Sequence, residues 1–212
     1  MSVTTILLTV ALLAANAFFV GAEFAAMSAR RSQLEPLAEA GSKRAQTALD
    51  AMQHTGILLA TCQLGITVCS VLLGAISEAA LHHALTPLFT GLGLSPVVAD
   101  VVALGLALGL IVFLHVVYGE MIPKNISIAR PERSALALVP PLVMVSKIVA
   151  PVIHAMDWLS KALIRLFGVE PKDELATAFT AEEVAHILNE SRDEGLVEDE
   201  HYRDREAIIT AH

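Results

Sequence analysis

Residues 97–122 read VVADVVALGLALGLIVFLHVVYGEMI, and this apolar run decides the fold class. An α-helix needs about 20 such residues to cross the hydrocarbon core of a bilayer. Two further runs of this kind lie at about 4–27 and about 57–81. No stretch shows the alternation typical of a strand, so the sequence predicts an all-α membrane protein with three transmembrane helices.

The composition agrees with a membrane protein. Of 212 residues, 55% are hydrophobic and only 5% are aromatic, which is more apolar than an ordinary soluble domain. The net charge of −8 is an uneven average, because acidic residues crowd the last forty positions. Lys and Arg form no extended basic patch, so we expect membrane lipid and no nucleic acid as a partner.

The basic residues predict the orientation of the spans. Lys and Arg follow the first and third runs but are absent from residues 45–123. Because basic residues concentrate on the cytoplasmic side, we expect a multi-pass protein of the cell (inner) membrane, with its N-terminus outside and its C-terminus in the cytoplasm. The residues in question are Arg30, Arg31, Lys43, Arg44, Lys124, Arg130 and Arg133.

A fourth apolar segment, at about 134–154, is interrupted by Pro140, Pro141 and Pro151 and is followed by cations. A full crossing would place those cations outside, so we expect a juxtamembrane or re-entrant helical hairpin. The sequence thus predicts three regions. They are a three-span region at 1–133, the hairpin at 134–170 and a cytosolic acidic helical segment at 171–212.

Polar side chains inside the spans need a reason, because they are costly at membrane depth. Asn16 and Glu23 share a face of the first span, and Gln63, Thr67 and Ser70 form a stripe on the second. Helix packing explains such residues, since hydroxyl and amide groups hydrogen-bond between helices. Taken alone, the second span favours this explanation, and a set of oxygen ligands is the alternative.

The end of the third span favours the second explanation. Pro123 has no N–H, so the carbonyl of Gly119 loses its helical partner beside the carboxylate of Glu120. Oxygen groups of this kind suit Mg²⁺, and Lys124 would balance the carboxylate when the ion is absent. Alternatively, Glu120 and Lys124 form an i, i+4 pair and Pro123 merely ends the span.

Other chemistry finds no support in the sequence. The histidines His82, His83 and His115 lack the spacing of a zinc site. No hydrolase motif and no Walker A loop is present. We therefore expect no enzyme activity.

Three stretches together resemble a known family. They read NAFFVGAEFAAMSARRSQLE (16–35), ATCQLGITVCSVLLGAISE (60–78) and FLHVVYGEMIPKNISIARPE (113–132). Their order and spacing are similar to the transmembrane domain of the CorC and cyclin M (CNNM, CorB) magnesium transporters. The resemblance covers roughly residues 4–170. The acidic helices after 175 look like the linker that precedes a pair of ATP-binding CBS domains, which are absent here, and we expect a truncated chain.

The resemblance implies a homodimer that holds Mg²⁺ among its spans and exports it, with Na⁺ as the coupling ion. ATP would bind only at the missing CBS domains. The Val20-Gly21 pair departs from the family pattern, so no ligand is expected from that turn. The implied metal ligands are Glu120, Ser70, Gly119, Asn16 and Glu23, supported by Pro123, Lys124, Thr67 and Gln63.

Two other classes of function stay open. The chain is a magnesium-sensing membrane regulator or scaffold if it binds the ion without moving it. It is a plain membrane anchor if its polar residues only hold helices together. Transport direction, coupling ion and selectivity among Mg²⁺, Mn²⁺ and Co²⁺ do not follow from ligand types.

Overall fold

A computed structural model of the chain describes residues 2–169, and within that range every regular element is a helix. The all-α membrane class is therefore confirmed. The predicted acidic segment at 171–212 lies outside the described residues. The elements are α1 (Val3–Ser28), α2 (Arg31–Glu39), α3 (Lys43–Ala51), α4 (Thr55–Leu73), the π-helical η1 (Gly74–Glu78), α5 (Ala79–Gly91), α6 (Pro96–Leu114), the π-helical η2 (His115–Met121), α7 (Ile122–Ala129) and α8 (Pro131–Leu166).

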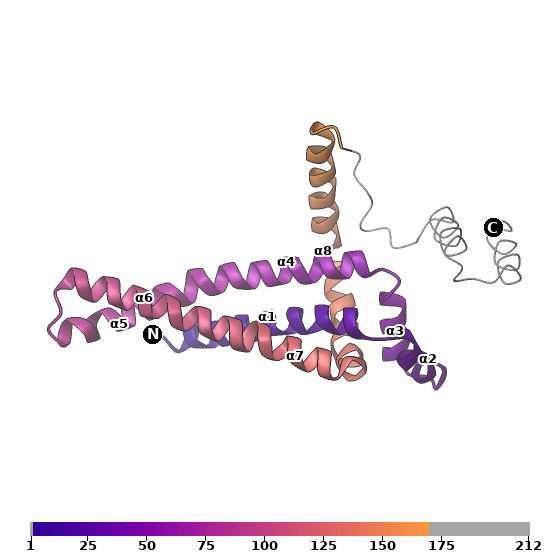
Figure 1. Cartoon of the computed structure of the whole chain (residues 1–212), viewed down its shortest axis with the longest axis horizontal. Coiled ribbons are helices and arrows are strands. Elements are labelled where there is room, and N and C mark those ends of the chain that lie inside the picture. Colours follow the sequence, from indigo (N-terminus) through magenta and orange to yellow (C-terminus); the bar gives the residue numbers. More distant parts are fainter. Residues whose placement is uncertain (1, 170–212) are drawn as a thin grey trace, which may run out of the picture. The chain divides into compact units, whose positions relative to one another are not determined.

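Several elements join end to end into long rods. The helices α4, η1 and α5 form one rod over Thr55–Gly91, and α6, η2 and α7 form another over Pro96–Ala129. Figure 1 shows the axes of these two rods and of α1 roughly aligned, with the α4–α5 rod antiparallel to the other two and with α5 and α6 as a hairpin at one end. Gly93, in the turn of that hairpin, has φ 88°, a conformation that glycine adopts without strain.

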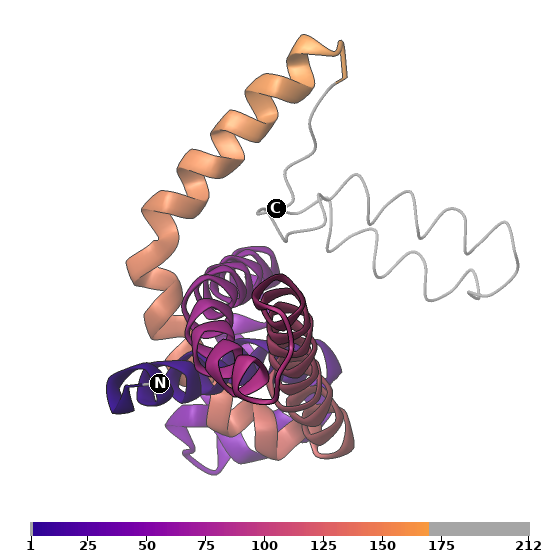
Figure 2. The ribbon, with the colours of Figure 1, turned by 90° about the vertical axis from the view of Figure 1, so that its left-hand side faces the viewer.

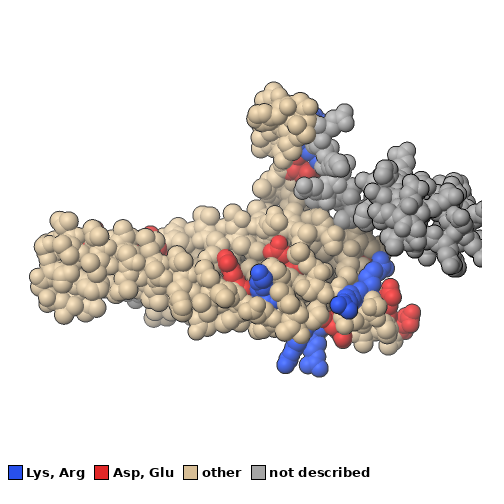
Figure 3. All heavy atoms as spheres, viewed as in Figure 1, with Lys and Arg blue, Asp and Glu red and all other residues tan. Residues whose placement is uncertain are grey.

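The charges divide along the rods. Lys and Arg gather toward the end that carries α2, α3 and α7, and none is seen at the α5–α6 end (Figure 3). Large apolar side chains stay exposed along α6, among them Val101, Leu106 and Phe113. An apolar surface of this extent suits contact with lipid or with another protein. Within residues 2–169, four helical segments are long and apolar enough to cross a membrane, namely α1, the two rods and α8.

The buried core consists mainly of small residues. Ala22, Ala25 and Ala26 of α1 pack with Cys62 of α4 and Leu142 of α8. Small side chains let helix backbones approach closely, which favours association where lipid removes the usual hydrophobic driving force. Both cysteines of the chain are buried and free.

The segment predicted to be a hairpin differs from that expectation, because residues 131–166 form one 36-residue helix, α8. The prolines at 140, 141 and 151 lie inside it. Proline removes one hydrogen bond and bends a helix, but the neighbouring turns continue when packing supports them. Here Val139, Leu142 and Ser146 are buried on each side of the proline pair.

The helix α8 crosses the rods instead of lying along them. It stands upright in Figure 1, where α1 and α4 run horizontally, and it stays in the plane of Figure 2, where the rods are seen end-on. It packs mainly against α1, α4 and α3, and also contacts α7.

Candidate functional site

The helix α1 and the two rods bring four polar side chains and one backbone carbonyl together. We call this set the polar cluster; it consists of Asn16 from α1, Ser70 from α4, and His115, Gly119 and Glu120 from η2. Four of the five belong to the ligand set that the sequence predicts. His115 is the addition.

Asn16 lies at the centre of the polar cluster and is fully buried. Its Nδ2 donates a hydrogen bond to the carbonyl oxygen of Gly119 at 3.0 Å. The hydroxyl of Ser70 donates to its Oδ1 at 3.4 Å. A buried amide needs partners for both its N–H groups and its oxygen. The amide of Asn16 finds them on two other helical segments, so it connects α1 to both rods.

The carbonyl of Gly119 is available to Asn16 for a local reason. Pro123 lacks the N–H that an α-helix would supply to that carbonyl. In addition, η2 is π-helical, and the N–H of Ile122 bonds to the carbonyl of Val117, five residues earlier. The carbonyl of Gly119, beside Glu120, accepts a hydrogen bond from a side chain of α1.

His115 connects Ser70 to Glu120. Its Nε2 lies 3.1 Å from the Ser70 hydroxyl and 3.6 Å from the Glu120 carboxylate oxygen Oε1. The His115 side chain is 19% exposed and that of Glu120 is 44% exposed. The imidazole therefore lies inside the polar cluster, and the carboxylate lies at its open edge.

The predicted ligand set lacks His115 because the prediction treated the third span as a regular α-helix. Positions five apart, such as 115 and 120, point about 140° apart on an α-helix. A π-helical turn has more residues, so the same two positions come to one side. The available signal for a departure from α-helical geometry was Pro123, which follows His115 and Glu120 closely in the sequence.

Glycine at 119 permits close packing. A Cβ at this position would lie 3.0 Å from Cδ2 of His115 and 3.1 Å from Nδ2 of Asn16, so these side chains would have to move by a few tenths of an ångström. With glycine, both side chains lie directly against the backbone here. The carbonyl can then reach Asn16.

Other predicted residues lie outside the polar cluster. Glu23 is half-buried two turns along α1. The ammonium of Lys124 lies over the ring of Phe24, 4.7 Å from its centroid, and within residues 2–169 it forms no ion pair with Glu120. Pro123 packs near Gly21, whose carbonyl accepts a hydrogen bond from Ser127 at 2.8 Å. The Val20-Gly21 turn thus serves helix packing.

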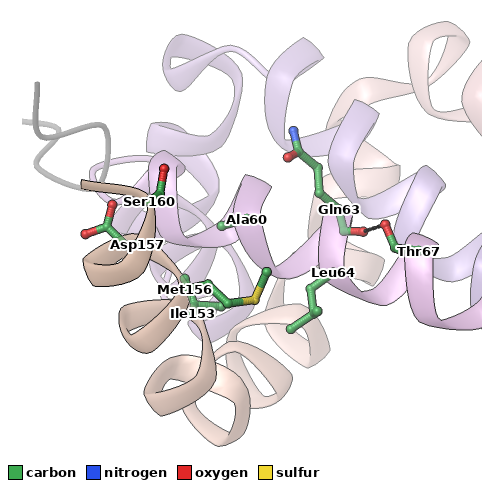
Figure 4. Close-up of a pocket in the computed structure, with 8 residues that line it drawn as sticks. All are labelled: Ala60, Gln63, Leu64, Thr67, Ile153, Met156, Asp157 and Ser160. Atoms are coloured by element: carbon green, nitrogen blue, oxygen red, sulfur yellow. Dashed lines mark hydrogen bonds between the residues drawn. The ribbon is translucent and has the colours of Figure 1, made fainter. Parts of the chain in front are cut away.

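Gln63 and Thr67 face a different space from Ser70. They line a cavity of about 420 Å³ between α4 and α8, together with Asp157 and Ser160 (Figure 4). The Thr67 hydroxyl donates to the carbonyl of Gln63 at 2.8 Å, so it is satisfied within its own helix. The structure therefore divides the predicted polar stripe of the second span between two sites.

The donor types of the polar cluster fit a hard divalent cation. It offers a carboxylate, a hydroxyl, an amide and a backbone carbonyl, which are ligands for Mg²⁺. Neighbouring donors in an octahedral site with bonds of about 2.1 Å are about 3.0 Å apart. The successive contacts from Asn16 through Ser70 and His115 to Glu120 are 3.4, 3.1 and 3.6 Å long, somewhat above that value, and two of the three end on the His115 nitrogen.

The polar cluster carries only one carboxylate. Within residues 2–169, no group of three or more His, Cys, Asp and Glu side chains is placed to hold a metal. A cation here would therefore depend on neutral oxygens and on water molecules that it retains, as Mg²⁺ commonly does. Such a site suits an ion that must also leave.

These features define a class: an all-α, multi-pass membrane domain with a buried polar cluster between its helices. The chain belongs to the cyclin M family, since it matches the cyclin M transmembrane N-terminal domain over residues 7–201. The predicted family is thereby confirmed.

Named relatives agree with this assignment. The chain is 43% identical over 199 residues to "Uncharacterized protein Rv1841c" of Mycobacterium tuberculosis, covering 94% of this chain and 56% of the relative. It is 35% identical over 201 residues to "UPF0053 protein YhdT" of Bacillus subtilis, covering 95% and 44% respectively. The chain thus spans about half the length of these relatives.

Proposed function

We propose that this chain is the membrane part of a magnesium transporter, in which the polar cluster binds Mg²⁺ during transport. The observation that carries the proposal is the chain of contacts, 3.0 to 3.6 Å long, that joins Asn16, Ser70, His115, Gly119 and Glu120. These contacts gather one carboxylate with hydroxyl, amide and carbonyl oxygens from three helical segments, and such oxygens are ligands for Mg²⁺. Membership of the cyclin M family supports it, because membrane domains of that family are linked to transport of magnesium and other divalent cations.

The proposal has several finer parts. Transport is Mg²⁺ export driven by Na⁺, and two copies of the chain form a homodimer. The exposed apolar surface of α5 and α6 supports the second part, since α5 buries no residue within one copy. The N-terminus lies outside and the C-terminus in the cytoplasm of the cell membrane, which the position of Lys and Arg supports.

Flux measurements test the proposal. Purified protein in sealed liposomes, loaded with a magnesium dye, should move Mg²⁺ when a Na⁺ gradient is applied. Glu120→Gln keeps the size of the side chain but removes the only charge of the polar cluster, so flux should fall to the level of empty liposomes. Asp100→Asn is the matched control, because Asp100 lies in the same rod, bonded to His82 at its far end, and it should leave flux unchanged.

The outcomes separate the alternatives. Full flux in Glu120→Gln would contradict the proposed site. Saturable Mg²⁺ binding without flux in the unaltered chain would favour the sensor or scaffold. Loss of stability alone in Glu120→Gln, with no change in Mg²⁺ affinity, would favour the membrane anchor.

A further inference from the structure

His115 is the one nitrogen base in a cluster whose other donors are oxygens. Its Nε2 is 3.1 Å from the Ser70 hydroxyl and 3.6 Å from Oε1 of Glu120. Both neighbours belong to the proposed ion site. An ion that these two oxygens share would therefore have the imidazole nitrogen within reach.

The ring of His115 is held in this position by packing. Cδ2, the carbon bonded to Nε2, lies 3.0 Å from the place where a Cβ on Gly119 would be. The ring edge that carries Nε2 thus rests against the backbone of η2, and the side chain is largely shielded from solvent. A fixed ring needs little reorganisation to become a ligand.

Nitrogen and oxygen donors differ in the cations they favour. Carboxylate, carbonyl and water ligands suit Mg²⁺, whereas imidazole suits Ni²⁺, Zn²⁺ and similar first-row ions. For a given site of mixed donors, affinity rises from Mn²⁺ through Co²⁺ to Ni²⁺. A single imidazole added to an oxygen site therefore changes selectivity more than it changes the binding of Mg²⁺.

We propose that His115 Nε2 is a direct ligand in the polar cluster and sets its selectivity, extending its cargo from Mg²⁺ to first-row divalent cations such as Co²⁺ and Ni²⁺. The inference rests on the proposed ion site and names a ligand that the predicted set lacks. The other role open to His115 is positional, since the ring can hold the Ser70 hydroxyl in place by a hydrogen bond alone.

Calorimetric titration of the purified full chain with Mg²⁺ and with Ni²⁺, at one fixed pH, separates the two roles. His115→Gln places an amide near the position of Nε2 and makes the donor set all oxygen. We expect Ni²⁺ affinity to fall by about tenfold or more relative to Mg²⁺ affinity. His83→Gln is the matched control, because His83 is exposed and stacks only on His82, and it should keep the ratio unchanged. An equal loss of both affinities, or an unchanged ratio, would overturn the ligand assignment.

A spectroscopic test does not depend on the folding of a variant. Mn²⁺ bound to the unaltered chain should show coupling to the ¹⁴N of an imidazole in pulsed electron paramagnetic resonance, and the absence of that coupling would overturn the proposal. Flux data keep this inference distinct from the proposed function. Nitrogen coupling without ion flux would support His115 as a ligand and contradict the proposed transport. Flux together with an unchanged ratio of Ni²⁺ to Mg²⁺ affinity in His115→Gln would support transport and contradict His115 as a ligand.

Discussion

At the scale of single residues, Gly119 shows how little space the polar cluster leaves. Its backbone lies under both His115 and Asn16, and a methyl group there would push these side chains by a few tenths of an ångström. The same residue provides the carbonyl that Asn16 binds. Packing and chemistry therefore depend on one position.

We expect Gly119→Ala to weaken Mg²⁺ binding more than it weakens the fold. The added methyl group displaces His115 or Asn16, and misplacing groups that orient ligands costs about 10- to 100-fold in metal affinity. Overpacking costs about 1–3 kcal/mol, but alanine returns about 1 kcal/mol of helix propensity. Calorimetry measures the affinity and thermal unfolding measures the stability. Gly109→Ala, where no atom lies within 4 Å, should change neither affinity nor fold adversely; an equal effect at both positions would contradict this explanation.

Sequence reasoning could group Asn16, Ser70 and Glu120 because each is a polar side chain inside an apolar span. It could add Gly119 because Pro123, four residues later, has no N–H for its carbonyl. It could not decide that Gln63 and Thr67 face α8 while Ser70 faces α1. All three lie on one side of α4, and the division depends on where two other helices pack. His115 escaped because its position depends on a π-helical turn.

At the scale of elements, α1 is the helix on which the others assemble. Both π-helical segments bond to it, η2 through Asn16 and η1 through a buried 2.7 Å hydrogen bond between Ser77 and Thr9. Its contact with α4 is equally close. There Gly65 lies against the ring of Phe19.

Gly65→Ala should separate α1 from α4. A Cβ at position 65 would lie 2.6 Å from three atoms of the Phe19 ring, which real contacts do not allow. We expect a loss of about 1–3 kcal/mol in the free energy of unfolding, the usual cost of overpacking. Chemical unfolding in detergent followed by circular dichroism measures it. Gly105→Ala, with open space around it, is the control, and an equal loss there would point to a general effect of alanine.

The element that sequence reasoning described least well is α8. Three prolines and a lysine in an apolar run indicate a break when read locally. The structure keeps one helix because Ala135, Val139 and Leu142 are buried against the core around α1. Packing between distant segments decided the outcome, and local propensity cannot reveal it.

At the scale of the whole molecule, charge and length suggest how the domain lies in a membrane. The α2–α3 end carries Lys and Arg, and the α5–α6 end carries none. We expect the first end in the cytoplasm and the second outside.

Thiol labelling in intact cells tests this orientation. The two native cysteines are replaced by alanine, and one cysteine is introduced at an exposed position, either Ala40 beside the α2–α3 turn or Ser95 beside the α5–α6 turn. A membrane-impermeant reagent should modify Ser95→Cys in intact cells and Ala40→Cys only after permeabilisation. The reverse pattern would show that the domain is inserted the other way.

The rod over Thr55–Gly91 has 37 residues. At about 1.5 Å per residue it is about 55 Å long, well beyond the roughly 30 Å of a bilayer's hydrocarbon core. The mismatch is relieved by tilting the rod or by thickening the surrounding lipid. Because η1 and η2 bond to α1 partway along the rods, tilting a rod would shift the polar cluster. We therefore expect the acyl-chain length of the surrounding lipids to change the affinity of the proposed ion site.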